Sequence, residues 1–143
     1  MRVAVIGCGS IARQRHAHEY SLNKNCEIAG FFDFVPERAE VLVSEYGGKV
    51  YQTLDELLED KSVDAVSVCV ANAYHAETTI KALRSGKHVL CEKPMAISLE
   101  DCEEMIKEAE KAGKRLMIGH NQRLTPAHRR AKEIIASGEM GKV

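Results

Sequence analysis

Short apolar runs alternate with longer amphipathic runs along the whole chain. The apolar runs are nearly continuous, which is typical of strands buried on both faces, and they occupy residues 3–6, 27–33, 63–70, 89–91 and 115–118. Helical patterns lie between and after them, at residues 11–22, 36–46, 73–85, 98–112 and 127–137. This alternation predicts an α/β fold in which helices cover both faces of a doubly wound parallel sheet, giving three layers.

Composition limits the classes of function that the chain can have. Its 143 residues, 45% apolar and 29% charged, suit one soluble globular domain. A net charge of −1 favours neither nucleic acid nor an anionic membrane, and no apolar run approaches the roughly 20 residues that span a bilayer. The five cysteines include no CxxC pair, so we expect no metal site and a reducing, cytoplasmic compartment.

A glycine-containing turn joins the first apolar run to the first helical pattern. Its sequence, Gly7-Cys8-Gly9-Ser10-Ile11-Ala12, has the form GxGxxA. Gly7 permits a tight turn, Gly9 lets a pyrophosphate approach the backbone, and Ala12 lets the helix pack closely on the strand. The start of the helix adds free N–H groups and partial positive charge. The turn therefore predicts a dinucleotide site in a Rossmann-type fold.

An acidic residue ends the second apolar run. Asp33 follows Ala12 by about 20 residues, where a carboxylate accepts hydrogen bonds from the adenosine ribose and repels a 2′-phosphate. A strand-end aspartate in an ordinary turn is the alternative. Arg38 is placed to stack on adenine or to soften the bias against a 2′-phosphate, and a solvated helix arginine is an equal alternative. We predict NAD as the cofactor, with NADP possible.

The fourth apolar run ends in Cys91-Glu92-Lys93-Pro94. In an open parallel sheet, ligands bind just outside the carboxyl ends of the strands. A lysine there can meet a substrate oxygen, where negative charge develops when a hydroxyl loses its proton while hydride leaves the same carbon. The alternative for Lys93 is an ordinary exposed lysine at a strand end.

These motifs resemble the N-terminal half of the glucose–fructose oxidoreductase, inositol dehydrogenase and MocA (Gfo/Idh/MocA) family. The resemblance covers essentially the whole chain. It is carried by the glycine turn with His16, Val63-Asp64-Ala65-Val66, Asn72 with His75, Ala82-Leu83, Gly86-Lys87-His88-Val89, Glu92-Lys93-Pro94, Gly119, Arg123, Pro126 and Gly138-Glu139-Met140-Gly141-Lys142-Val143.

The resemblance implies hydride transfer between a nicotinamide cofactor and a CH–OH group of a sugar, inositol or related polyol. It implies Lys93 as the catalytic residue, with Glu92 either contacting the cofactor or orienting Lys93. It also implies a cis peptide bond before Pro94. With the motifs above, it gives these cofactor-binding residues: Gly7, Gly9, Ser10, Ile11, Asp33, Phe34, Arg38, Val70, Ala71, Asn72, His75, Glu92, Lys93 and Asn121.

Several details of the resemblance need separate interpretation. Asn121 and Arg123 have two interpretations, lining the cofactor pocket or holding the interdomain hinge. Ala71 stands where the family usually has proline, so the turn before Asn72 is less rigid. His75 has two equal interpretations, a contact near the nicotinamide or a structural hydrogen bonder. The other histidines considered are interpreted as surface or packing residues, namely His16, His18, His88 and His128.

Family members continue into a second domain with a mostly antiparallel sheet, which supplies much of the sugar pocket, usually a histidine acid/base, and the oligomer interface. We expect residues 1–124 to form the dinucleotide domain and residues 125–143 a terminal helix and the start of a substrate domain that this chain lacks. We therefore expect the chain alone to bind NAD(H) but to turn over sugars poorly, and the full-length protein to form a homo-oligomer.

Two other functions use the same glycine turn. A non-catalytic nucleotide-binding or redox-sensing module, acting with a partner chain, is compatible with the turn and with Asp33. Lys93 argues against it, because a sensor needs no ammonium beside the nicotinamide. A domain that binds CoA or a nucleotide sugar makes less use of Asp33.

Overall fold

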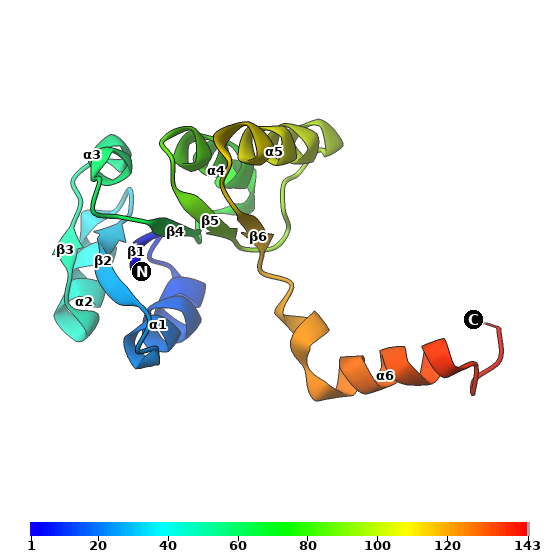
Figure 1. The fold of residues 1–143 in the computed structure, drawn as a ribbon. Coiled ribbons are helices and arrows are strands. Elements are labelled where there is room, and N and C mark those ends of the chain that lie inside the picture. The colour runs from blue at the N-terminus through cyan, green and yellow to red at the C-terminus, as the bar shows by residue number, and fades with distance from the viewer. Residues whose placement is uncertain (143) are drawn as a thin grey trace.

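Within residues 1–142, which the computed structural model describes, six parallel strands form one sheet (Figure 1). Their order is β3-β2-β1-β4-β5-β6, so the order reverses between β1 and β4. Such a reversal opens the crevice in which a doubly wound sheet binds its ligands. The strands are β1 (Arg2–Ile6), β2 (Glu27–Phe32), β3 (Lys49–Val50), β4 (Ala65–Val68), β5 (His88–Cys91) and β6 (Leu116–Ile118).

The helices cover both faces of this sheet. One layer contains η1 (Ala12–Ala17), α1 (His18–Leu22) and α2 (Pro36–Tyr46). The opposite layer contains α3 (Leu54–Glu59), α4 (His75–Arg84), which follows the short turn η2 (Asn72–Tyr74), and α5 (Leu99–Ala112). After β6 come η3 (Asn121–Leu124) and α6 (Pro126–Ser137), and α6 extends away from the sheet (Figure 1). The predicted three-layer α/β fold is therefore confirmed.

Each face of the sheet buries its own apolar cluster. Ala4 and Ile6 of β1 belong to the larger cluster, and Val5 between them belongs to the smaller one, because successive strand side chains point to opposite faces. Leu83 of α4 packs in the larger cluster and Leu42 of α2 in the smaller. Burial on both faces explains why the central strands have nearly continuous apolar sequences.

Several boundaries differ from the sequence prediction by one or two residues, and three differences are larger. The run 63–70 contributes only Ala65–Val68 to its strand, and the helix predicted at 11–22 is π-helical over Ala12–Ala17 before it becomes α1. The edge strand β3 was not predicted, since its two residues are too few to show an alternating pattern. None of the described helices has the length and apolar character to cross a membrane.

Lys87 is a buried cation just before β5. Its side chain is almost fully buried, with the residue 3% exposed, and Nζ donates to the carbonyl oxygens of Asp60 at 2.6 Å and Val63 at 2.9 Å. These bonds connect the end of α3 and the segment before β4 to the start of β5. Burial lowers the pKa of the Lys87 ammonium below its usual value of 10.5.

We expect Lys87→Met to lower the free energy of unfolding by about 1–3 kcal/mol, because two buried carbonyl groups lose their donor. The lowered pKa means that the unfolded chain binds more protons than the folded chain between the two pKa values, so wild-type stability rises with pH there. Urea unfolding of both proteins from neutral pH toward 10.5 measures the difference. The deficit of the variant should widen as pH rises, and equal stability throughout would contradict this role.

Candidate functional site

The turn after β1 is fixed by contact with the turn after β4. Gly7 has a φ of +90°, and a Cβ on it would lie 2.7 Å from backbone atoms of Cys69 and Val70. Only glycine fits such a close approach with this backbone conformation. A Cβ on Gly9, by contrast, would have no atom within 4 Å. Packing therefore requires glycine at position 7 but not at position 9, where a ligand close to the backbone would require it.

The first helix starts directly beyond this turn. The Arg13 N–H donates to the Gly9 carbonyl oxygen at 3.1 Å, so the helix begins around Ser10 and Ile11. Amide groups in the first turn of a helix have no intrahelical acceptor, which suits them to bind phosphate oxygens. Burial raises the pKa of the Cys8 thiol to about 12, so this side chain adds no negative charge to the turn.

Asp33 connects the end of β2 to the glycine turn. Its Oδ2 accepts from the Cys8 N–H at 2.7 Å and its Oδ1 from the Val35 N–H at 2.8 Å, and Arg38 Nη1 lies 3.8 Å from Oδ1. Two carboxylate oxygens offer about four acceptor positions, so further positions remain for ribose hydroxyl groups. Phe34 is 74% exposed at the rim beside this carboxylate. The structure thus brings Asp33, Phe34 and Arg38 together next to the turn.

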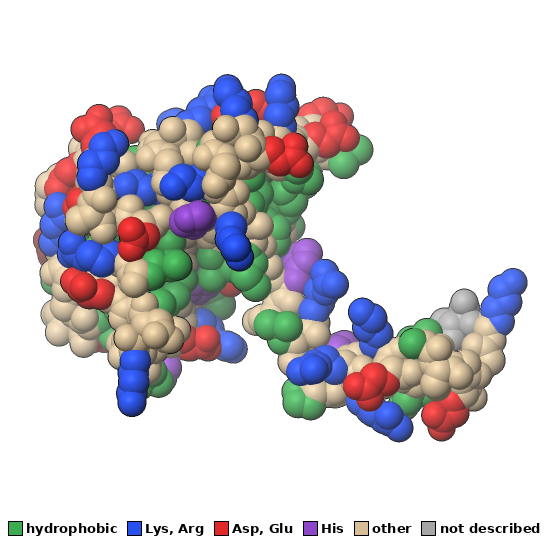
Figure 2. Space-filling model, in the orientation of Figure 1, with side chains coloured by type: hydrophobic (Ala, Val, Ile, Leu, Met, Phe, Trp, Pro, Cys, Tyr) green, Lys and Arg blue, Asp and Glu red, His purple; other side chains and the backbone are tan. Residues whose placement is uncertain are grey.

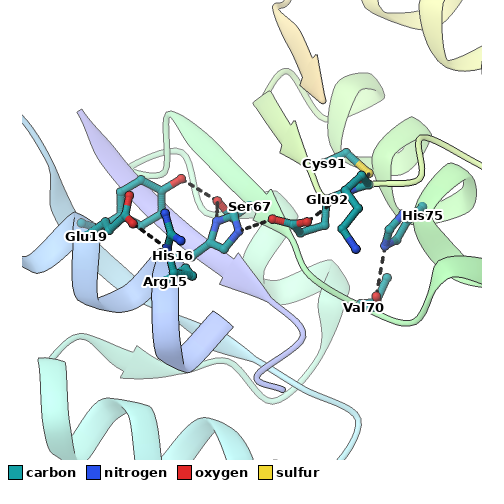
Figure 3. A network of polar contacts seen from close by, with 10 residues as sticks. Arg15, His16, Glu19, Ser67, Val70, His75, Cys91 and Glu92 are labelled. Atoms are coloured by element: carbon teal, nitrogen blue, oxygen red, sulfur yellow. Dashed lines mark hydrogen bonds and ion pairs between the residues drawn. The ribbon is translucent and has the colours of Figure 1, made fainter. Parts of the chain in front are cut away.

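His75 connects the segments that follow β4 and β5. It is 1% exposed, and one ring nitrogen lies 3.1 Å from the Val70 carbonyl oxygen (Figure 3). The other ring nitrogen lies 2.6 Å from the Pro94 carbonyl oxygen. Both nitrogens thus contact the backbone, which favours the structural interpretation, and a cofactor contact stays a prediction. The Lys93–Pro94 peptide is cis, as the resemblance implies. Asn72 is exposed at the start of η2.

Glu92 and Lys93 differ sharply in their surroundings. Lys93 is exposed at the carboxyl end of β5, while the Glu92 side chain is only 13% exposed. The Lys93 N–H donates to Glu92 Oε2 at 3.2 Å, and a Cβ on Gly119 would lie 3.1 Å from Glu92 Oε1. Gly119 therefore leaves the room that this carboxylate occupies. The ammonium is accessible to a substrate, and the carboxylate is held against the protein.

His16 is the residue whose surroundings the sequence reasoning missed. It is buried, and it links Ser67 of β4 to Glu92 through its two ring nitrogens, at 3.1 Å and 3.0 Å (Figure 3). His16 is therefore not a surface residue: it is buried, as a packing role implies, and it also belongs to a polar network that the sequence did not predict. Ser67 could have signalled this network, because a hydroxyl group in an otherwise apolar buried strand needs a partner.

Asn121 lies on a different part of the site. It belongs to η3 and lines a groove of about 1220 Å³ between the first helix, the β5–β6 edge and α6, which Figure 2 shows as a hollow beside α6. Glu92 and His16 line the same groove. Asn121 and Glu92 thus line one groove at the β5–β6 side of the sheet, while Gly9 follows β1 and Asp33 follows β2. No group of three His, Cys, Asp or Glu side chains within residues 1–142 is arranged to hold a metal ion.

Comparison with known proteins identifies the family. The model of an oxidoreductase family with an NAD-binding Rossmann fold (GFO_IDH_MocA) matches residues 1–120. The chain belongs to the Gfo/Idh/MocA oxidoreductase family. This match confirms the NAD(P)-binding Rossmann domain that the glycine turn and Asp33 predict.

Individual relatives agree with the family match. The chain is 38% identical to glucose-6-phosphate 3-dehydrogenase of Bacillus subtilis, over 99% of its own length and 40% of the relative. It is 35% identical to myo-inositol 2-dehydrogenase of Thermotoga maritima, over 99% of its own length and 42% of the relative. KijD10, a 3-ketoreductase from Actinomadura kijaniata solved in complex with NADP and TDP-benzene, has a TM-score of 0.91 at 33% identity, over 96% of this chain and 42% of that one. The chain thus spans about two fifths of the length of these relatives.

Proposed function

We propose that this Gfo/Idh/MocA chain is the cofactor-binding part of an enzyme that transfers hydride between NAD(P) and a CH–OH group of a sugar, inositol or related polyol. One observation carries the proposal: Lys93 is exposed at the carboxyl end of β5, at the same edge of the sheet as the open backbone of Gly9. The names of the Bacillus subtilis and Thermotoga maritima relatives support this substrate class.

The cofactor-binding residues fall into three groups in this proposal. The turn and helix start hold the pyrophosphate, the end of β2 holds the adenosine, and the ends of β4 and β5 with η3 hold the nicotinamide half. In that order, the groups are Gly7, Gly9, Ser10 and Ile11; Asp33, Phe34 and Arg38; and Val70, Ala71, Asn72, His75, Glu92, Lys93 and Asn121.

Lys93 is the catalytic residue in this proposal. When bound, the nicotinamide supplies a hydride acceptor or donor. The Lys93 ammonium hydrogen-bonds the substrate oxygen and stabilises the negative charge that develops there as the hydroxyl proton passes to an acid/base residue, which the family resemblance implies for the second domain. In the opposite direction, the same ammonium polarises the substrate carbonyl. Glu92 holds the backbone of Lys93 through the bond from the Lys93 N–H.

A test of the cofactor follows from the charge of Asp33. We expect NADH to bind more tightly than NADPH, because this carboxylate lies where a 2′-phosphate would approach. In Asp33→Asn the preference should fall by about tenfold, since a neutral amide removes the repulsion and Arg38, 3.8 Å from Asp33, becomes free to meet a phosphate. Fluorescence titrations of both proteins with both dinucleotides measure the ratio. Tighter binding of NADPH to the wild-type chain would contradict the assignment.

We propose that residues 1–124 are the dinucleotide domain and that residues 125–143 begin a substrate domain. The extension of α6 away from the sheet supports this division (Figure 1). A longer homo-oligomeric protein would complete the sugar site, so we expect the 143-residue chain alone to turn over sugars poorly or not at all. The five cysteines, all free thiols, support a reducing cytoplasmic compartment. The alternative of a non-catalytic redox sensor has no observation in its favour.

A further inference from the structure

A row of polar side chains crosses the interior from the first helix to the end of β5. The Tyr20 hydroxyl lies 2.6 Å from Ser67 Oγ, which lies 3.1 Å from His16 Nδ1. His16 Nε2 lies 3.0 Å from Glu92 Oε1, and Glu92 Oε2 accepts from the Lys93 N–H (Figure 3). The row therefore ends on the residue to which we assign the chemistry.

The hydrogen-bonding capacity of each group gives this row a direction. The Glu92 carboxylate can only accept, so His16 Nε2 must carry a proton. A neutral imidazole then has a bare Nδ1, which requires the Ser67 hydroxyl to donate to it. Ser67 Oγ in turn accepts from the Tyr20 hydroxyl, which keeps its proton because burial raises its pKa. With Glu92 as a carboxylate and an uncharged His16 ring, one arrangement of donors and acceptors satisfies every contact, and in it His16 has the Nε2–H form.

Glu92 depends on this row because it has little access to water. A buried carboxylate needs donors, and the bonds described here supply one to each oxygen: His16 Nε2 to Oε1 and the Lys93 N–H to Oε2. Without the His16 donor, the carboxylate would lose the contact that orients it and would turn toward solvent. Its other oxygen would then leave the Lys93 N–H.

The helix that carries His16 has an unusual local geometry. Residues Ala12–Ala17 form a π-helical segment, and within it His16 faces the sheet while Arg15 faces outward and pairs with Glu19 at 2.7 Å. Single turns of π-helix occur frequently at functional sites, where they change the direction of a side chain. This geometry is a second observation that His16 has a task beyond filling space.

We propose that His16 is a positioning residue for Lys93, acting through Glu92, with Ser67 and Tyr20 selecting its Nε2–H form; this inference rests on the function proposed for Lys93. The same bonds connect the helix behind the pyrophosphate site to the strand end that carries the ammonium. The first helix therefore has two tasks, binding phosphate at its start and orienting the catalytic segment from its second turn.

Nuclear magnetic resonance of the 143-residue chain tests this positioning role without any turnover assay. We expect imidazole nitrogen spectra to show His16 with Nε2 protonated and Nδ1 bare, and to show a mixture of tautomers in Ser67→Ala. We expect His16→Leu to speed hydrogen exchange of the Lys93 amide by about tenfold, the effect of losing one bond to a charged acceptor. His16→Gln should largely restore protection, because its amide nitrogen can donate where Nε2 does.

The exposed His18, on the same helix, provides the matched control. His18→Leu should leave exchange of the Lys93 amide unchanged. An Nδ1–H form of His16, unchanged exchange in His16→Leu, or equal acceleration in His16→Leu and His16→Gln would overturn the proposal. Should His16→Leu fail to fold, the proposal is still tested by the tautomer of His16 in the wild type and by the hydrogen-exchange rate of the Lys93 amide in His16→Gln. These readouts do not depend on whether Lys93 acts in hydride transfer, which turnover of a Lys93 variant tests separately.

Discussion

Lys93→Met is expected to lower kcat by about 10²–10⁴-fold in the longer protein of which we propose this chain is part. Methionine keeps the length of the side chain but removes the ammonium, so the charge that develops on the substrate oxygen loses its stabilising partner. The dissociation constant for NADH should change by no more than about twofold, because the pyrophosphate and adenosine contacts are left intact. Steady-state kinetics and a direct NADH titration measure the two quantities.

Lys107 provides the matched control for this substitution. It lies on α5 with its side chain 73% exposed, away from the carboxyl ends of the strands, so Lys107→Met should alter neither quantity. Equal losses of NADH affinity and turnover in Lys93→Met would indicate that Lys93 maintains the structure. Unchanged turnover would remove Lys93 from the chemistry altogether.

Gly7→Ala is expected to destabilise the protein strongly, whereas Gly9→Ala, in the same turn, is expected to leave its stability almost unchanged. At position 7 a methyl group would meet the backbone of Cys69 and Val70 at 2.7 Å, in a left-handed conformation, so we expect a loss of about 3 kcal/mol or more in the free energy of unfolding. At position 9 it would meet nothing within 4 Å, so stability should stay within about 1 kcal/mol of the wild type. Urea unfolding distinguishes the two variants.

The contrast between these glycines separates packing from binding. Gly7 is required because the turns after β1 and β4 touch, and Gly9 has no such neighbour. If both variants were equally unstable, glycine at position 9 would have a structural explanation. If both were as stable as the wild type, the close approach at Gly7 would not constrain the fold.

The sequence predicted the buried strands and the first turn because both depend on short patterns of residue type. Strands buried on both faces have apolar sequences, so the runs containing Val5 and Val66 were found, and the glycine turn marked the first crossover. The two-residue strand β3 was not predicted, because it is held by pairing with β2 and not by a pattern of its own. The π-helical segment likewise depends on what the first helix packs against.

The sequence predicted the site residues whose position follows from a single segment, namely those that directly follow a strand. Gly9, Asp33 and Lys93 each stand at a strand end, and parallel strands bring their carboxyl ends to one edge. The contact between His16 and Glu92 joins residues 76 positions apart in the sequence. The choice between a structural and a cofactor-binding role for His75 depends on its contacts with backbone carbonyl groups, which no pattern of side chains reveals. Such contacts require the assembled sheet.

The most direct test of the central claim is a calorimetric titration with NADH of the wild-type chain and of Gly9→Ala, under conditions in which both proteins are folded to the same extent. We predict a saturable, single-site isotherm for the wild type and an affinity at least about tenfold weaker for Gly9→Ala, because its methyl group occupies the space that the pyrophosphate would need. Equal affinity in the two proteins, or no binding by the folded wild type, would contradict the claim that this turn holds the dinucleotide.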